Sequence, residues 1–142
     1  YNLGIERFHR TLEKFPEVNF IGHAQTWWGN IDKDHKQEVM YPKTKVTSGG
    51  ITDKLLSNYP NMYGDFSAGS GLNSMLRDEE HAKDFLARHS SQLLYGSDCP
   101  DSAGRGAGCK GFVILNTIRR LAKNKEVERQ ILHHNAKKLF KL

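Results

Sequence analysis

Residues 92–98 read QLLYGSD and decide the fold of this chain, because a short apolar run there ends on a carboxylate, Asp98. Two earlier stretches repeat the pattern: FIGHA at 20–24 carries His23, and NMYGDFS at 61–67 carries Asp65. Each run follows a helix-like stretch, which predicts parallel strands joined by right-handed crossovers. The carboxyl ends of parallel strands meet at one edge of a sheet, where α/β barrels and open α/β sheets keep their active sites. The pattern therefore predicts an enzyme.

The segments between these runs predict helices that cover the sheet. Residues 3–15 place apolar side chains at helical spacing, and later segments repeat that spacing. Periodicity is lost over residues 23–50, which predicts a long loop, and either Thr52 or Asp53 is expected to cap the helix that follows. The expected order is α, β, α, β, α, β, α, α. No break in composition divides the chain, so residues 1–142 are expected to form one domain.

The composition narrows the classes of partner. With 37% hydrophobic and 26% charged residues among 142, the chain has enough apolar side chains for an ordinary core. The net charge of +5 comes from Lys and Arg scattered beside acids, which indicates a solvated surface and argues against a nucleic-acid partner. No apolar stretch approaches the roughly 20 residues that span a membrane, so no membrane partner is expected.

The two cysteines, Cys99 and Cys109, are too few for a disulfide framework. They are close enough in sequence to bridge one loop, but free thiols are expected. A cytoplasmic location is expected with them.

Taken alone, the polar residues at the strand ends leave several roles open. A carboxylate that leaves a buried strand, such as Asp98, is costly unless it is paired or binds a cation. Helix capping is its alternative role, although Pro100 and the glycines that follow argue against a helix there. A lone histidine such as His23 is more often structural than catalytic, and Asp65 is expected to cap the next helix. The other histidines show no metal-ligand spacing and are expected at the surface: His9, His35, His81, His89, His133 and His134.

A competing motif lies in the Gly-rich segment after Asp98. Gly106, Gly108 and Gly111 match G-x-G-x-x-G before a helix, as dinucleotide-binding loops do. That fingerprint requires a tight turn directly after a strand and a later strand with a ribose-binding acid, and neither condition is met. A flexible active-site loop is expected instead.

The combined motifs resemble a known family. FPEVNFIGHA (15–24) with the WW after it, YPNMYGDFSAGSGLNSMLRD (59–78), QLLYGSDCP (92–100) and ILHHNAKKLFKL (131–142) resemble the C-terminal part of the amidohydrolase-2 family. Its members are metal-dependent (β/α)₈ TIM-barrel hydrolases and decarboxylases. The resemblance implies an α/β fold that is the C-terminal part of such a barrel. Its sixth, seventh and eighth strands would be Val18–Gly22, Met62–Phe66 and Leu93–Gly96.

The resemblance also implies roles for single residues. Asp98 would contact a divalent metal, expected to be Zn²⁺, and move a proton to or from the attacking water. His23 would polarise the substrate or steady the metal-bound water, whose pKa a bound zinc can lower to about 7. Trp27 and Trp28 would wall the substrate pocket, with ordinary loop packing as the alternative. Asn135 would be structural.

Most metal ligands of the family come from a strand-one His-x-His pair and a strand-five histidine, which this chain does not contain. We therefore expect the C-terminal portion of a metal-dependent hydrolase that acts on a C–N or C–O bond of a small organic substrate. A nonoxidative decarboxylase of the same family and a nonenzymatic remnant or assembly module are the alternatives. Because three parallel strands leave unpaired edges, a complementary N-terminal half or a second copy is the expected partner.

Overall fold

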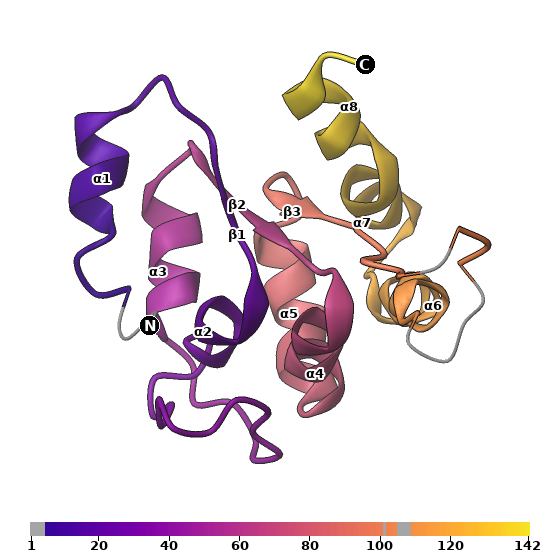
Figure 1. The fold of residues 1–142 in the computed structure, drawn as a ribbon, viewed down its shortest axis with the longest axis horizontal. Helices are drawn as coiled ribbons and strands as arrows, with labels where there is room; N and C mark the ends of the chain where they lie inside the picture. Colours follow the sequence, from indigo (N-terminus) through magenta and orange to yellow (C-terminus); the bar gives the residue numbers. More distant parts are fainter. Residues whose placement is uncertain (1–4, 101, 105–108) are drawn as a thin grey trace.

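Three short parallel strands lie between helices in the structure, a computed structural model that describes residues 5–100, 102–104 and 109–142 (Figure 1). Gly106 and Gly108 of the competing glycine motif lie outside these residues. In Figure 1, α1 and α3 lie to the left of the strands and α6 to α8 to their right. The elements, in chain order, are α1 (His9–Lys14), β1 (Phe20–Gly22), α2 (Ala24–Gly29), α3 (Ile51–Asn58), β2 (Met62–Asp65), α4 (Ala68–Leu76), α5 (Glu79–Arg88), β3 (Leu93–Leu94), α6 (Gly111–Leu121), α7 (Lys125–Arg129), the π-helical η1 (Gln130–His134) and α8 (Asn135–Phe140).

The sheet has the order β1-β2-β3, and both strand pairs are parallel. Gly22 pairs with Gly64, and Asp65 pairs with Leu94, so the carboxyl ends of the strands meet at one edge. The predicted mixed α/β class with a small parallel sheet is confirmed, and it is compatible with part of a TIM barrel. The assignment of these strands as the sixth to eighth of a barrel stays a prediction.

All three strands are shorter than predicted. β2 ends at Asp65, one residue before the predicted end, and at β1 and β3 hydrogen bonds to neighbouring segments replace the ladder. β1 begins at Phe20, since the Val18 N–H donates to the carbonyl of Phe15 in a turn, at 3.1 Å. β3 stops at Leu94, since the Tyr95 N–H donates to the carbonyl of Ile131 in η1, also at 3.1 Å. The C-terminal helical segment therefore takes the place of a strand at the end of β3.

The C-terminal helical segment is anchored to the sheet by Asn135. Its Nδ2 donates to the carbonyls of Ser90 and Leu93, at 2.6 Å and 2.8 Å, and the residue is buried. Two backbone carbonyls at the start of β3 are thereby satisfied by one amide. The predicted structural role of Asn135 is confirmed.

The predicted loop over residues 23–50 is wrong at its start, because α2 follows β1 directly. Helical turns carry Trp27 and Trp28 into the core, where the Trp28 ring stacks on Phe66 with centroids 4.3 Å apart. A Cβ atom at Gly22 would lie 2.2 Å from Cδ2 of Trp27, so the end of β1 requires a residue without a side chain. Burial of two large rings stabilises a helix that the local sequence pattern did not indicate.

The helix α3 is not capped as predicted. It begins at Ile51 with Gly50 at the cap, while the Thr52 hydroxyl donates to the Trp27 carbonyl at 2.5 Å. Asp53 instead binds the side chains of His89 and Arg88, through Oδ1 at 2.6 Å and 2.5 Å. Burial alone would raise the pKa of Asp53, but the hydrogen bonds from His89 and Arg88 hold it well below its ordinary value.

The surface prediction for the histidines is wrong for His81 and His89, which are 9% and 3% exposed. Both lie in or after α5 against Phe85, with ring centroids 5.8 Å and 4.7 Å away. Both ring nitrogens of His81 are buried without a hydrogen-bond partner, and burial lowers its pKa. The charged form of His81 is therefore disfavoured in the folded chain.

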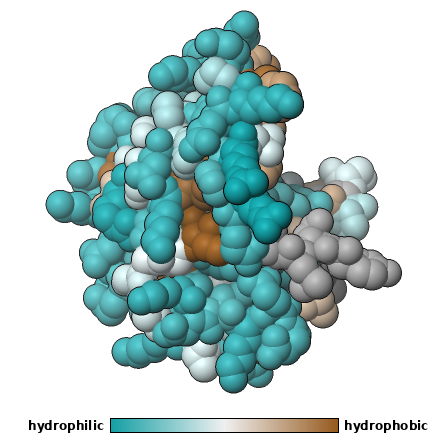
Figure 2. Space-filling view, turned by 90° about the vertical axis from the view of Figure 1, so that its left-hand side faces the viewer, coloured by the Kyte–Doolittle hydropathy of each residue, from teal (hydrophilic) through white to brown (hydrophobic). Residues whose placement is uncertain are grey.

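The face on the α1 side is mostly hydrophilic, with an exposed apolar area near its centre (Figure 2). Among exposed apolar side chains near the outer strand are Val18 and Ile21, which are 48% and 42% exposed. Within the described residues β1 pairs with β2 alone, so its other edge carries no strand there. No helix in this part of the chain has the length and apolar character needed to cross a membrane.

Candidate active site

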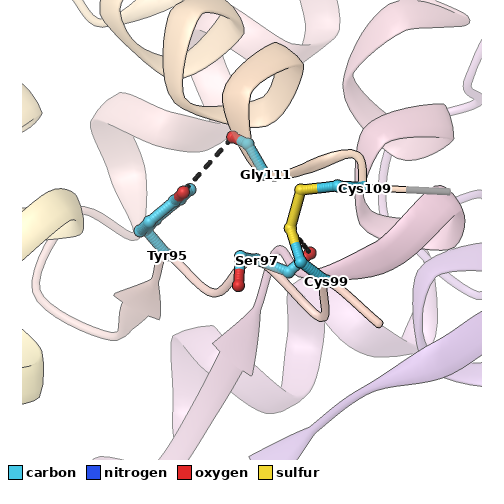
Figure 3. Close-up of a disulfide and its surroundings, with 5 residues drawn as sticks. All are labelled: Tyr95, Ser97, Cys99, Cys109 and Gly111. Carbon is cyan, nitrogen blue, oxygen red and sulfur yellow. Dashed lines mark hydrogen bonds between the residues drawn. A yellow bond between two sulfur atoms is a disulfide. The ribbon is translucent and has the colours of Figure 1, made fainter. Parts of the chain in front are cut away.

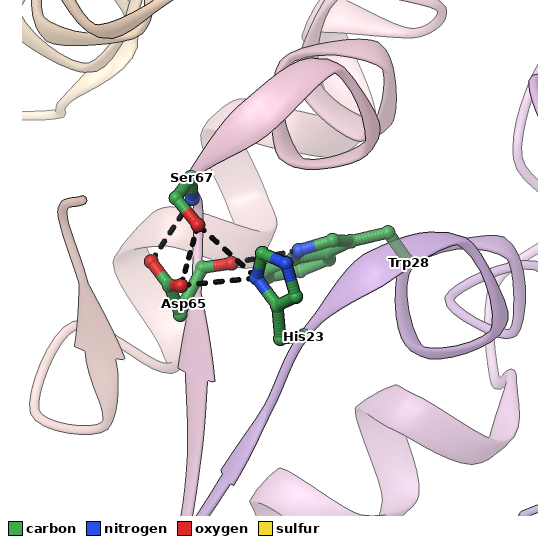
Figure 4. Close-up of polar contacts among 4 residues, drawn as sticks. All are labelled: His23, Trp28, Asp65 and Ser67. Atoms are coloured by element: carbon green, nitrogen blue, oxygen red, sulfur yellow. Dashed lines mark hydrogen bonds and ion pairs between the residues drawn. The ribbon is translucent and has the colours of Figure 1, made fainter. Parts of the chain in front are cut away.

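Three polar side chains meet at the carboxyl end of the sheet (Figure 4). His23 follows the last residue of β1, Asp65 ends β2, and Ser67 precedes α4. Nδ1 of His23 lies 3.1 Å from Oδ2 of Asp65 and 3.1 Å from Oγ of Ser67. The Ser67 hydroxyl donates to the same carboxylate oxygen at 2.5 Å. The register of β1 against β2 brings these residues together although they are 42 and 44 positions apart in sequence.

The contacts favour one arrangement of the protons at His23. An ionised carboxylate can only accept hydrogen bonds, so the nitrogen of His23 that faces Asp65 must carry the proton. The Ser67 proton points to Asp65, which leaves a lone pair of its oxygen toward Nδ1. With Nδ1 protonated, the Nε2 nitrogen of neutral His23 carries the free lone pair. The His23 side chain is 43% exposed, so this lone pair can act on a molecule at the edge of the sheet.

The same geometry excludes Ser67 as a nucleophile activated by His23. In a serine nucleophile triad the hydroxyl and the carboxylate bind opposite nitrogens of the imidazole. Here both contact Nδ1, and the hydroxyl proton is already donated to Asp65. The arrangement is therefore an imidazole base held by two oxygens.

Asp65 is held by hydrogen bonds to both its side chain and its backbone. Its Oδ1 accepts from the Ser67 N–H at 2.9 Å, and its backbone carbonyl accepts from Nε1 of Trp28 at 2.9 Å. A Cβ atom at Gly96 would lie 2.8 Å from Oδ1, so the chain leaving β3 passes close to this carboxylate. The prediction that Asp65 caps the next helix is wrong, because Ser67 is the cap residue of α4 and no side chain of the described residues caps it; the Asp65 carboxylate binds the N–H of Ser67 and the imidazole of His23 instead.

Asp98 lies on the segment that leaves β3, two residues after Gly96. Its side chain is exposed, and its φ of 47° is in the left-handed region. The described residues give no hydrogen bond from Asp98 to His23, Asp65 or Ser67. The structure therefore pairs His23 with Asp65, and the catalytic and metal-binding roles of Asp98 stay predictions.

A metal site is not complete in this part of the protein. Imidazole and carboxylate are suitable zinc ligands, and a catalytic zinc site normally has three protein ligands. Among the described residues, no group of three or more His, Cys, Asp or Glu side chains is arranged to hold a metal ion. The donors are of the right kind but too few, so these residues alone do not fit the metal.

The predicted pocket walls Trp27 and Trp28 are 4% and 2% exposed, which leaves them almost no surface to offer a substrate. Their packing role is shown, and substrate contact stays a prediction.

An aromatic ring that was not predicted as a site residue lies near the polar cluster. Tyr41, 45% exposed, accepts a hydrogen bond from Nε2 of Gln25 at 2.9 Å, and its ring comes within 3.6 Å of a Cβ built on Gly69. Gln25 and Gly69 each lie two residues beyond a member of the polar cluster.

A disulfide joins Cys99 and Cys109, so the prediction of free thiols is wrong (Figure 3). The two Cα atoms lie 4.4 Å apart because the chain returns to the start of α6, where the Tyr95 hydroxyl donates to the carbonyl of Gly111 at 3.3 Å. The bond ties the segment that carries Asp98 to α6. A disulfide is more typical of an oxidising compartment, which weighs against the predicted cytoplasmic location.

Residues 53–142 match the model of a protein family described as Amidohydrolase. The match covers more than half of the 142 residues and includes Asp65, Ser67 and Asp98, whereas His23 lies before it. No curated protein and no solved structure matches the chain.

Proposed function

Because this chain belongs to the amidohydrolase family, we propose that it takes part in hydrolysis of a C–N or C–O bond in a small organic substrate, with His23 as the proton-transfer residue. The observation that carries the proposal is the asymmetry of the imidazole. Nδ1 is bound by Asp65 and Ser67, while Nε2 lies on a side chain that is 43% exposed. A histidine held in this way is suited to acid–base catalysis.

Hydrolysis needs a base that takes a proton from water and an acid that returns one to the leaving nitrogen or oxygen. Nε2 of His23 would accept the water proton as the oxygen attacks, and the imidazolium that forms would be stabilised by the carboxylate of Asp65. The same proton would then pass from Nε2 to the leaving group. Asp65 keeps Nδ1 protonated throughout, so Nε2 is the nitrogen that exchanges protons.

Amidohydrolases generally use divalent metals, which polarise the substrate and favour ionisation of bound water when present. We assign Asp98 to that metal, because its carboxylate is exposed and lies on the segment after β3. Zn²⁺ is our choice of ion, since imidazole and carboxylate ligands suit it. The other ligands would come from the complementary N-terminal half, and no step is derived through the metal.

The outer edge of β1 is a site where a further strand would pair. The edge of β1 opposite β2 carries no strand among the described residues, and Ile21 beside it is 42% exposed. An unpaired strand edge favours pairing with another strand. We propose that this edge pairs with a complementary N-terminal half or with a second copy of the chain, as closure of a TIM barrel requires.

The test uses the complete protein and two sets of substrates. Lactones and amides report hydrolysis, and carboxylic acids report CO₂ release, which would indicate the decarboxylase alternative. His23→Gln should lower hydrolysis by at least about a hundredfold, the scale for loss of a general base, without a change in circular dichroism. Full activity in folded His23→Gln protein would contradict the proposal. Activity in neither set would support the nonenzymatic alternative.

A further inference from the structure

We infer that Ser67 is a positioning residue that holds His23 in the tautomer and ring orientation needed for catalysis. The inference rests on the proposed function, because it assigns to Nε2 of His23 the proton transfer described above. Ser67 lies 3.1 Å from Nδ1, as does the carboxylate of Asp65. It is also 4% exposed, so its hydroxyl makes hydrogen bonds within the protein and hardly contacts the solvent.

The hydrogen bonds of Ser67 differ from those of an ordinary serine at the start of a helix. Serine at the cap of a helix ordinarily accepts a hydrogen bond from the backbone of the first turn, which stabilises the helix. Ser67 is the cap residue of α4, but its side chain makes no capping bond. The hydroxyl instead donates to Asp65 and faces Nδ1 of His23. The residue thus forgoes the usual stabilisation of α4 in favour of the cluster.

Two oxygens that accept from one N–H fix the orientation and the tautomer of the imidazole more strongly than one oxygen would. Rotation of the ring by a half turn would place a carbon atom against both oxygens and remove both contacts. Movement of the proton to Nε2 would leave the Nδ1 lone pair facing the Asp65 carboxylate, which cannot donate. Because the proton of Ser67 is already donated to Asp65, Ser67 could compensate only by breaking that bond.

Ser67 itself is held in place by the backbone. Its N–H donates to Oδ1 of Asp65 at 2.9 Å while its hydroxyl donates to Oδ2, so one carboxylate fixes both the main chain and the side chain. The next residue, Ala68, has a φ of 59° in the left-handed region, which turns the chain sharply into α4.

The first experiment measures the tautomer of His23 by ¹⁵N NMR of the imidazole ring in the full chain, at a pH where the ring is neutral. Wild type should show mainly the form protonated at Nδ1. Ser67→Ala should raise the fraction protonated at Nε2 by at least about threefold, because one of the two oxygens is lost. Ser67→Thr should restore the wild-type ratio, since threonine retains the hydroxyl.

Ser74→Ala is the matched control. Ser74 lies in the same helix, α4, and its buried hydroxyl donates to the carbonyl of Gly71 at 2.7 Å, away from His23. This variant should leave the tautomer ratio of His23 unchanged although it also loses a hydroxyl hydrogen bond. An unchanged ratio in folded Ser67→Ala protein, or an equal change in Ser74→Ala, would overturn the inference.

The second experiment is kinetic and uses the complete enzyme. Ser67→Ala should lower kcat by roughly tenfold with little change in KM, because the orientation of the base is disturbed and substrate binding is not. An unchanged kcat would overturn the positioning role. If wild-type protein shows the Nδ1 tautomer and its dependence on Ser67 but hydrolyses no substrate, the proposed function fails while the assignment of Ser67 stands.

Discussion

Gly22 lies directly against the indole ring of Trp27, so that a Cβ atom at position 22 would approach the ring atom Cδ2 to 2.2 Å. The residue after this glycine is His23, and Trp27 is in the helix that follows. The close contact between Gly22 and Trp27 therefore lies one residue before the imidazole of His23. Packing in the core and geometry at the candidate active site depend on the same contact.

Gly22→Ala should destabilise the chain by about 1–3 kcal/mol, the usual cost of forcing an extra methyl group into a packed core. Thermal unfolding by circular dichroism measures the change. Gly69→Ala is the control, since its nearest contact would be an ordinary 3.6 Å to Tyr41. Equal melting temperatures for Gly22→Ala and wild type would show that the Trp27 ring shifts to accommodate the methyl group without a loss of stability.

His81 should make the stability of the chain depend on pH. Burial lowers its pKa below the ordinary value of 6.5, so the unfolded chain binds a proton that the folded chain does not. The contribution of neutral His81 to the free energy of unfolding should therefore be complete above about pH 6.5, and it should be lost as the pH drops toward the pKa of the folded state. Urea unfolding at a series of pH values measures this slope.

His81→Phe should reduce that slope and raise the stability near neutral pH. Phenylalanine retains the contact with the ring of Phe85 and removes two buried nitrogens that have no hydrogen-bond partner. Leaving such a group unsatisfied costs about 1–3 kcal/mol, which is the gain expected. The control is His133→Phe, at an exposed position. A variant His81→Phe with the wild-type slope would assign the pH dependence to other groups.

The disulfide should be present in protein purified without reductant. Thiol reagents should then find no reactive cysteine, and reduction should expose both Cys99 and Cys109. Cys99→Ser combined with Cys109→Ser should lower stability by about 3 kcal/mol or less, since the bond closes a short loop. Two reactive thiols in the native, unreduced protein would mean that the bond does not form in solution.

Tyr41 should affect the choice of substrate more than the chemistry. Tyr41→Ala removes the exposed ring that lies beside Gln25 and Gly69, and the KM of bulky substrates should rise roughly tenfold, within the 1–3 kcal/mol of a lost apolar contact. Tyr41→Phe keeps the ring and should behave much like wild type. Steady-state kinetics with a large and a small substrate distinguish this from a general loss of kcat.

The sequence predicted the placement of His23 and Asp65 at strand ends and left their partnership open. Apolar runs, helical spacing and prolines are local signals, so strands and helices followed from them with errors at the ends. Asp65 was expected only to cap a helix, and Ser67 was not selected, because a serine before a helix is an ordinary cap. No local pattern shows that such a hydroxyl turns instead toward a residue 44 positions earlier.

The sequence by itself determined the alternation of helices and strands, the common edge at which His23 and Asp65 appear, and the family resemblance. These depend on side-chain spacing within short segments. Only the tertiary structure decided that His23 binds Asp65 and Ser67, that Trp27, Trp28, His81 and His89 are buried, and that Cys99 reaches Cys109. Each of these depends on strand register or on packing between segments far apart in the chain, where the stabilising contacts are made in space and leave no periodic signal in the sequence.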